Sequence, residues 1–441
     1  MDVDLIMAVD VIRATTLAPF SADLRRERTR AVAMACIVIL AFAGWLGLEM
    51  PRGIVFGTDE LLTAERTREM LLTDPWVVHY NFEYSFEKPP LQYWLTSLTL
   101  PRFQNRAVAV RIWPLFYGVL TAIALARLVR LILPDRPWLT PLSVAILISG
   151  PLFSVEAANG LLDIGLTFFT VLTIIFAEVA RKKPAWWLGA AIGCWLGSLQ
   201  KMPVPFLIWI LILIVRLTNS DERTNLRKGI GWLSGSLIVA IALMSIWPLL
   251  QLLRYQMPVG NVFHQEVVVW LGPTGLGKRP YFEIPLRMGM IGGLCGLLSF
   301  LALFVVLFSR AWRSIRAVRE IAIVSLLVII LAVLFNFRSV RYMLPIFPLL
   351  CFLLALVIAR VWERGGRVRT GTIVALVVLF IAGITQSEIT IALRHKNVAD
   401  EKLIAEKLGA LQRSGSETVL IKAGPSSDLL WDSFYLFHGN F

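Results

Sequence analysis

Residues 57–95 carry the densest group of chemically active side chains in the sequence. The charged members used below are, in chain order, Asp59, Glu60, Arg66, Glu69, Glu87 and Lys88. A carboxylate such as Asp59 can act as a general base toward an acceptor hydroxyl. Two prolines follow Lys88 and stiffen the backbone, so its ammonium is held on a fixed bend that suits a phosphate. These residues predict an acid–base and anion-binding site, although solvated loop acids and an anchoring lysine at a membrane interface would use the same residue types.

The remainder of the chain has the composition of a membrane scaffold. Of 441 residues, 57% are hydrophobic and 17% are charged, and the mean hydropathy is +0.70. Apolar runs of roughly 18 or more residues recur, which is the length of helix that crosses ~30 Å of hydrocarbon. A membrane β-barrel would instead show alternating segments of about ten residues, whereas 321–335 and 372–384 are apolar on every face. The sequence therefore predicts an all-α, polytopic integral membrane protein.

We expect about eleven transmembrane helices from the apolar runs of the sequence. They lie near residues 31–48, 108–126, 138–154, 163–180, 185–199, 203–215, 231–248, 288–308, 320–335, 343–359 and 371–388. Basic clusters fall on every second loop, and positive loops face the cytoplasm. This pattern places the N-terminal tail, residues 1–30, in the cytoplasm and the first loop, 49–107, in the periplasm of a bacterial inner membrane. The net charge of +13 reflects these clusters, which we interpret as anchors to the inner leaflet, not as a nucleic-acid surface.

The C-terminal segment differs in composition from the membrane part. We take residues 31–390 as the transmembrane catalytic domain and 391–441 as a periplasmic segment. The segment is too short for a core of its own, so it is either part of a soluble domain or docks on the membrane part. The four cysteines lie inside apolar runs without paired spacing, which predicts packing residues and neither a disulfide nor a metal set.

The order of motifs in the first loop resembles that of the GT-C glycosyltransferases. The likeness is strongest to the undecaprenyl-phosphate aminoarabinose transferases that modify lipid A, and more distant to the protein O-mannosyltransferases. The motifs that carry it are Asp59-Glu60, Arg66-x-x-Glu69-Met70, Asp74-x-Trp76-x-Val78 and Glu87-Lys88-Pro89-Pro90-x-x-Tyr93-Trp94-Leu95. Weaker matches follow at Arg111, Asp163, Lys201 and the pair Arg341-Tyr342, so that the resemblance covers about residues 50–360.

The resemblance implies transfer of a sugar from a polyprenyl-phosphate donor, with inversion at the anomeric carbon. Asp59 would activate the acceptor, Asp163 would orient the acceptor or the donor sugar, and Glu60 would either assist or hold the loop. The leaving group is a lipid phosphate, whose growing charge is stabilised by cations. The candidates for this role are Lys88, Arg341 with Tyr342, Lys201, and Lys278 with Arg279. Further site candidates from the same motifs are Arg66, Glu69 and Arg111.

Two departures from the family pattern affect the anion site. Met202 follows Lys201 where the family usually has a glycine, and residues 267–270 are apolar where relatives tend to carry a basic residue. Lys278 and Arg279 are the nearest substitutes for that basic residue.

This chemistry requires no cofactor, but the resemblance implies one possible metal site. Glu87 and His264 correspond to positions where an aminoarabinose transferase can hold a divalent cation near the lipid phosphate. The alternative is that His264 is an ordinary polar loop residue, and the sequence has no HxH or HExxH spacing.

Alternatives remain open for the acceptor and for the class of protein. Lipid A or another envelope glycan is the leading acceptor, and protein hydroxyls are the runner-up. A transporter or lipid flippase is the alternative from another class, because charges such as Arg254 at a membrane edge could line a path. We find neither repeated halves nor Gly- or Pro-interrupted helices at matching positions, which disfavours a transporter.

Overall fold

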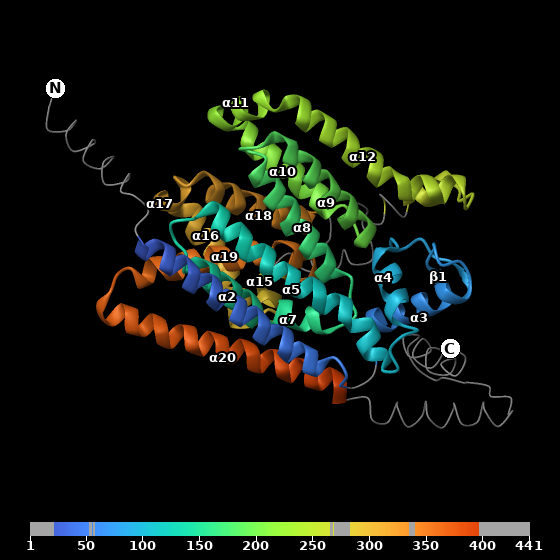
Figure 1. The fold of residues 1–441 in the computed structure, drawn as a ribbon, viewed down its shortest axis with the longest axis horizontal. Coiled ribbons are helices and arrows are strands. Elements are labelled where there is room, and N and C mark those ends of the chain that lie inside the picture. Colours follow the sequence, from blue (N-terminus) through green and yellow to red (C-terminus); the bar gives the residue numbers. More distant parts are fainter. Residues whose placement is uncertain are drawn as a thin grey trace.

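The computed structural model is a helical bundle capped at one end by the first loop (Figure 1). It describes residues 22–52, 55, 58–264, 268, 283–334 and 340–396. The longer helices of the bundle are α2 (Ala22–Glu49), α5 (Arg106–Ile132), α6 (Leu139–Ser149), α8 (Asp163–Val179), α9 (Trp187–Gln200), α10 (Val204–Leu217), α12 (Ile230–Leu253), α16 (Gly293–Phe308), α18 (Arg316–Leu334), α19 (Phe347–Trp362) and α20 (Gly366–Lys396). Shorter helices are α7 (Pro151–Ala158), α11 (Ser220–Lys228), α13 (Val259–Phe263), α15 (Glu283–Met290), α17 (Arg310–Arg313), η1 (Pro184–Trp186) and η4 (Val340–Ile346).

The chain is a multi-pass membrane protein. In the described residues, six helices are long and apolar enough to cross a membrane, or up to eight if two bent pairs each count as one span. The predicted all-α, polytopic class is therefore confirmed. A helix overlaps every predicted span, but several are short, so the number of about eleven crossings stays a prediction.

Burial separates central from peripheral helices. The candidate span Val340–Trp362 is 78% buried, whereas the spans in α12 and α20 are only 22% and 17% buried. Figure 1 shows α12 and α20 on opposite flanks of the bundle. Their exposed apolar side chains, such as Leu253 at 77% exposure, suit contact with lipid, where a soluble protein would have to cover them.

One predicted span is broken. Residues 138–154 were expected to form a continuous helix, but α6 and α7 meet at a 66° bend. Gly150 has an extended backbone, and Pro151 has no N–H with which to continue α6. A Cβ at Gly150 would lie 2.8 Å from the ring of Phe347, so a larger residue could not occupy this contact with α19.

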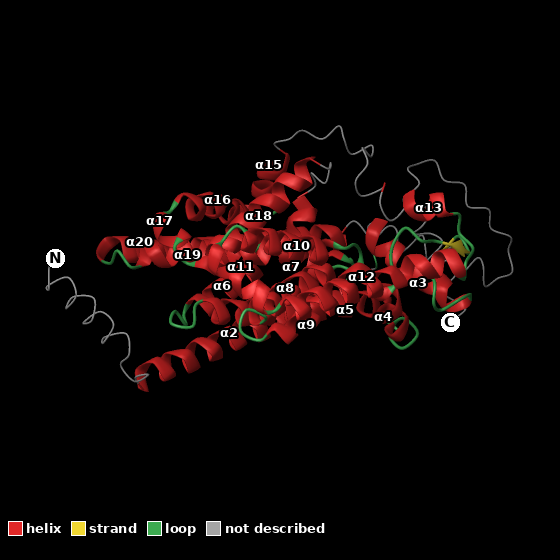
Figure 2. Cartoon of the chain, turned by 90° about the horizontal axis from the view of Figure 1, so that it is seen from above, coloured by secondary structure: helices red, strands yellow, loops and turns green. Residues whose placement is uncertain are grey.

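The cap is formed by α3 (Thr58–Leu72), the two-stranded hairpin β1 (His79–Tyr80) and β2 (Glu83–Tyr84), and α4 (Leu91–Thr99). Residues 63–72, whose apolar and charged residues predict an amphipathic interfacial helix, lie within α3. In Figure 2 the cap lies at the far end of the molecule from the start of α2. The hairpin turn places Asn81 and Phe82 at positive φ, and the Glu69 carboxylate accepts hydrogen bonds from both backbone N–H groups, at 3.1 and 2.8 Å. Glu69 therefore stabilises a turn that side chains otherwise disfavour.

A buried ion network joins four helices away from the cap. Arg216 of α10 is bound to Glu320 of α18 through two hydrogen bonds of 2.9 Å and to Glu178 of α8 at 3.1 Å. Arg181 also binds Glu320, at 2.7 Å, and pairs with Glu222 of α11. Arg216 belongs to one of the basic clusters that we interpreted as lipid anchors. That interpretation is wrong for Arg216, because its side chain is 1% exposed and its guanidinium pairs with carboxylates inside the protein.

Candidate active site

Four predicted site residues from distant parts of the chain meet in one ion cluster beneath the cap. A guanidinium nitrogen of Arg341 lies 2.6 Å from a carboxylate oxygen of Asp59, and Nε lies 3.5 Å from Asp163. Lys201 donates to the other oxygen of Asp163 at 2.6 Å. The cluster thus joins α3, α8, the end of α9 and η4.

Helix ends create this convergence. Asp163 is the first residue of α8, where the helix dipole favours a negative charge. Lys201 follows the last residue of α9 in a non-helical backbone conformation. Gln200 fixes the two ends relative to each other, because its amide donates to the carbonyl of Leu162 at 3.1 Å and to the side chain of Gln92 at 2.9 Å.

The two carboxylates of the cluster differ in access. The Asp59 side chain is 49% exposed, whereas that of Asp163 is 4% exposed. Both oxygens of Asp163 contact cations, so this residue is committed to holding Lys201 and Arg341. Asp59 is the carboxylate that an acceptor can reach.

Lys88 adds a further cation to this group. Burial lowers the pKa of Lys88 below its ordinary value, and the positive charge of Lys201 lowers it further, while Glu87 and Asp163 act in the opposite direction. Lys201 also lies 5.4 Å from the ring centre of Tyr342. Lysine charges held close together in partial burial create a local positive potential that a phosphate would relieve.

Arg66 and Glu87 form an ion pair close to Lys88. Arg66 is 4% exposed, donates to Glu87 at 2.6 Å and lies 5.4 Å from the ring centre of Tyr80. Burial alone would raise the pKa of Glu87, but the hydrogen bond and charge of Arg66 outweigh it and lower that pKa.

The proposed metal site involves the same Glu87. In the part of the chain that is described, no group of three or more His, Cys, Asp or Glu side chains could hold a metal ion. His264 is exposed at the end of α13. Since one Glu87 oxygen already accepts from Arg66, a cation would have to compete with that pair, and the metal site stays a prediction.

Glu60, adjacent to Asp59, has a different environment. It forms a two-point ion pair with Arg111 of α5, at 2.8 and 3.0 Å, and both side chains are at most 2% exposed. Glu60 also accepts from the backbone N–H of Gly160 at 2.8 Å, and Arg111 donates to the carbonyl of Arg52 at 2.8 Å. Of the two roles open to Glu60, these contacts favour holding the loop.

Two residues next to the cluster had no predicted role. Glu156 is 6% exposed and close enough to Arg341 for an electrostatic interaction. Tyr93 is 1% exposed and hydrogen-bonds to Arg66. Tyr93 stands inside a motif quoted above and Glu156 lies seven residues before Asp163, but a single sequence does not reveal which of these residues face inward. Lys278 and Arg279 lie outside the described residues.

Comparison with known proteins shows which proteins the chain resembles. A family model described as dolichyl-phosphate-mannose-protein mannosyltransferase matches residues 87–247, a range that contains Lys88, Asp163 and Lys201. The undecaprenyl phosphate-alpha-4-amino-4-deoxy-L-arabinose arabinosyl transferase 2 of Pseudomonas fluorescens is 24% identical over 292 residues, which is 63% of this chain and 48% of that protein. A transferase of the same description from Pseudomonas aeruginosa is 26% identical over 264 residues, which is 57% of this chain and 46% of that protein. The chain resembles the aminoarabinose transferases. It spans about half the length of the curated relatives it matches.

Solved structures show that the chain shares the GT-C fold of these transferases. ArnT from Cupriavidus metallidurans in the apo state has a TM-score of 0.67 and 18% identity, with coverage of 92% of this chain and 84% of that chain. ArnT bound to undecaprenyl phosphate has a TM-score of 0.64 and 20% identity, covering 80% of this chain and 63% of that chain. The oligosaccharyltransferase of Archaeoglobus fulgidus has a TM-score of 0.57 and 13% identity over 92% of this chain and 59% of that chain. The family likeness predicted from the first-loop motifs is therefore confirmed.

Proposed function

We propose that the chain is a membrane glycosyltransferase that moves a sugar from a polyprenyl-phosphate donor to an acceptor in the cell envelope. The observation that carries this proposal is the ion cluster, in which the exposed Asp59 lies against Arg341, and Lys201 and Lys88 stand next to them. A base beside several cations is the arrangement that such a transfer needs. The relatives named for undecaprenyl phosphate and the ArnT structure bound to that lipid support the choice of donor.

The reaction assigns each group a step. Asp59 takes the proton of the acceptor hydroxyl, and the resulting oxygen attacks the anomeric carbon of the donor sugar. The bond from that carbon to the phosphate oxygen breaks, and both of its electrons leave with the polyprenyl phosphate. Lys88, Lys201 and Arg341 stabilise the charge that builds up on the phosphate. Direct displacement inverts the configuration of the anomeric carbon.

Arg341 has two roles in this proposal. In the free protein it pairs with Asp59 at 2.6 Å. A donor phosphate competes with Asp59 for the guanidinium, so that donor binding loosens the pair and frees the Asp59 carboxylate to contact the acceptor hydroxyl. Asp163, held by Lys201 and Arg341, keeps both cations in place.

The acceptor is proposed as lipid A, with an aminoarabinose-like or related sugar. Residues 31–390 would form the catalytic domain. This domain would cross a bacterial inner membrane about eleven times, as the apolar runs of the sequence predict. The N-terminus would be cytoplasmic and the cap periplasmic. Transfer to protein hydroxyls is the second candidate, because the matching family model is described as a protein mannosyltransferase.

The test is sugar transfer by the purified full chain. Radiolabelled polyprenyl-phosphate sugars are offered with lipid A or with a Ser/Thr peptide, and product is counted for wild type, Asp59→Asn and Asp221→Asn. Asp221 of α11 is an exposed acid that pairs with Arg316 of α18, so its variant controls for the loss of one carboxylate elsewhere. We expect transfer to lipid A that disappears only in Asp59→Asn. A folded protein that transfers from no donor to either acceptor would refute the proposal.

Lipid A itself is a second readout. A strain that lacks this protein should lose one sugar from its lipid A, measured by mass spectrometry. An unchanged lipid A profile together with peptide labelling would assign the protein acceptor instead.

A further inference from the structure

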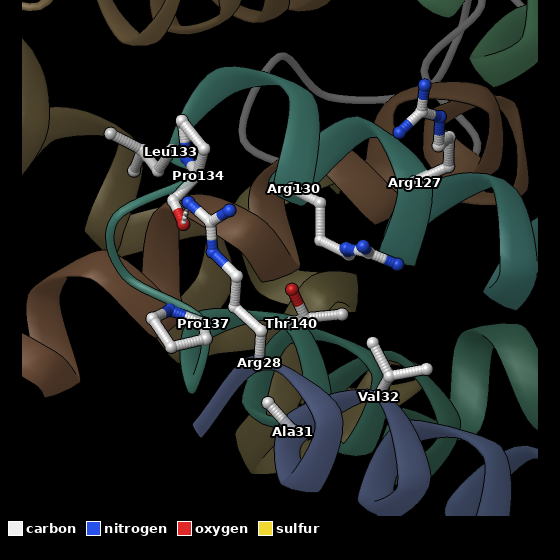
Figure 3. A pocket seen from close by; sticks show the side chains of 9 residues that line it. All are labelled: Arg28, Ala31, Val32, Arg127, Arg130, Leu133, Pro134, Pro137 and Thr140. Atoms are coloured by element: carbon white, nitrogen blue, oxygen red, sulfur yellow. Dashed lines mark hydrogen bonds between the residues drawn. The ribbon is translucent and has the colours of Figure 1, made fainter. Parts of the chain in front are cut away.

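A basic pocket lies at the end of the bundle opposite the cap. Arg28 of α2, Arg127 and Arg130 of α5, and Thr140 of α6 line a cavity of about 190 Å³, shown in Figure 3. None of these residues belongs to the candidate active site, and for the basic clusters of the chain the sequence predicts only a general role as anchors to the inner leaflet.

The positive charge of the pocket is only weakly neutralised. Arg28 donates to the carbonyl of Pro134 at 2.8 Å and lies 3.5 Å from Asp135, whose side chain is 82% exposed. Among the described residues, no carboxylate lies within 4.0 Å of the guanidinium of Arg127 or Arg130. The pocket is therefore lined by three arginines, two of which have no carboxylate neighbour among the described residues, and this favours an anionic ligand.

Thr140 provides a second and independent indication of a ligand. It is 2% exposed, and its hydroxyl has no hydrogen-bond partner within the described part of the chain. In Figure 3 this hydroxyl points into the space between the side chains of Arg28 and Arg130. Buried hydroxyls are rarely left without a partner, because desolvation then goes uncompensated. A ligand oxygen in the pocket would supply the missing partner.

The position of the pocket indicates where the ligand comes from. Arg111, which holds the cap through Glu60, and Arg130 stand on the same helix, 19 residues apart. At 1.5 Å per residue they are separated by about 28 Å along α5, close to the ~30 Å thickness of the hydrocarbon core. If the cap lies at one membrane surface, the pocket lies at the headgroup level of the other.

We propose that this pocket binds the phosphate of an anionic membrane lipid. Arg28 and Arg130 would donate to the phosphate oxygens, since guanidinium groups bind phosphate through paired hydrogen bonds, and Thr140 would donate to a third oxygen. Ala31, Val32 and Leu133 line the rest of the cavity and suit the apolar part of a lipid. Basic pockets between transmembrane helices are known to bind lipid headgroups in this way. The proposal does not depend on the transferase activity.

The experiment measures lipid binding to the full chain by native mass spectrometry in a neutral detergent. Short-chain phosphatidylglycerol is titrated into wild type, Arg130→Gln, Thr140→Val and Arg227→Gln, and phosphatidylcholine serves as the zwitterionic lipid. Arg227 is exposed on α11 and does not line the pocket, so its variant loses the same charge elsewhere. Loss of one charge-assisted hydrogen bond should weaken phosphatidylglycerol binding about tenfold in Arg130→Gln.

The outcomes separate the possibilities. Specific binding that weakens in Arg130→Gln and Thr140→Val, but not in Arg227→Gln, supports the pocket. An equal loss in all three variants, equal binding of phosphatidylcholine, or no lipid adduct on wild type would overturn it. Displacement of the lipid by millimolar inorganic phosphate would assign a free phosphate as the ligand and refute the lipid. Thr140→Val removes no charge and one hydroxyl, so it tests the site even if Arg130→Gln fails to fold.

Discussion

Asp59 and Glu60 are neighbours in sequence and the same kind of side chain, yet the structure predicts opposite consequences for their loss. Glu60→Gln removes the charge opposite Arg111, while the guanidinium stays buried at 1% exposure. Breaking one side of a buried ion pair costs about 3–5 kcal/mol, because the remaining charge is desolvated and uncompensated. Asp59 is 49% exposed, so the loss of its pair with Arg341 in Asp59→Asn should cost no more than about 1 kcal/mol.

Turnover should follow the reverse order. If Asp59 is the general base, its amide analogue should lose roughly 10²–10⁴-fold in rate, with donor binding retained. Glu60→Gln should lose activity only in proportion to the protein that unfolds. The assay measures the apparent melting temperature in detergent alongside transfer per folded molecule. Two results would refute the reasoning. One is a Glu60→Gln protein as stable as wild type, and the other is an Asp59→Asn protein that keeps near-normal turnover.

Three other variants test separate parts of the structure. Lys88→Ala should weaken donor binding and turnover together. Donor binding by the wild type should fall as pH rises through the pKa of Lys88, which burial and Lys201 lower below its ordinary value. A donor titration across pH checks this, and an effect of the variant on acceptor affinity alone would contradict it. Glu69→Ala should loosen the hairpin turn by about 1–3 kcal/mol, since two backbone donors lose their acceptor, and faster proteolysis of the cap would report it. Arg216→Met should destabilise by about 3–5 kcal/mol because Glu320 and Glu178 stay in the protein and then share Arg181. The double variant with Glu320→Leu removes one of the two acids and should recover most of the melting temperature. No recovery would show that packing, not charge, is responsible.

Much of the fold follows from the sequence because the bilayer leaves few choices. A helix must satisfy its own backbone hydrogen bonds in lipid, so long apolar runs such as the one in α5 predict their own structure. The break between α6 and α7 was missed because Gly150 and Pro151 stand in an apolar run, and only the approach of Phe347 shows why the chain bends there. Arg216 was misread for a related reason: a basic residue at a helix end indicates a lipid anchor unless its buried partner, here Glu320, is known.

The site was predictable to the extent that motifs mark it. Asp59, Asp163, Lys201 and Arg341 were selected from separate motifs, and the structure joins them in one series of contacts, in which Arg341 contacts both acids and Lys201 contacts Asp163. The difference between Asp59 and Glu60 was not predictable, because it depends on Arg111, 51 residues away, and on a backbone N–H at Gly160. At Gly160 a Cβ would lie 2.3 Å from Val110, so only glycine allows the backbone to reach Glu60.

Arginines near the two ends of α5 have different roles. At the cap, Arg111 is fully buried and bound to Glu60, so its charge is used to hold the first loop in position. At the other end, Arg130 is exposed and near an unsatisfied hydroxyl, so its charge is available to a ligand. Because α5 is a single continuous helix, a lipid bound at the far end would fix the height of the helix in the membrane. The same helix carries the residue that holds the loop containing Asp59, so in these two proposals contacts at both membrane surfaces would set the depth of the active site.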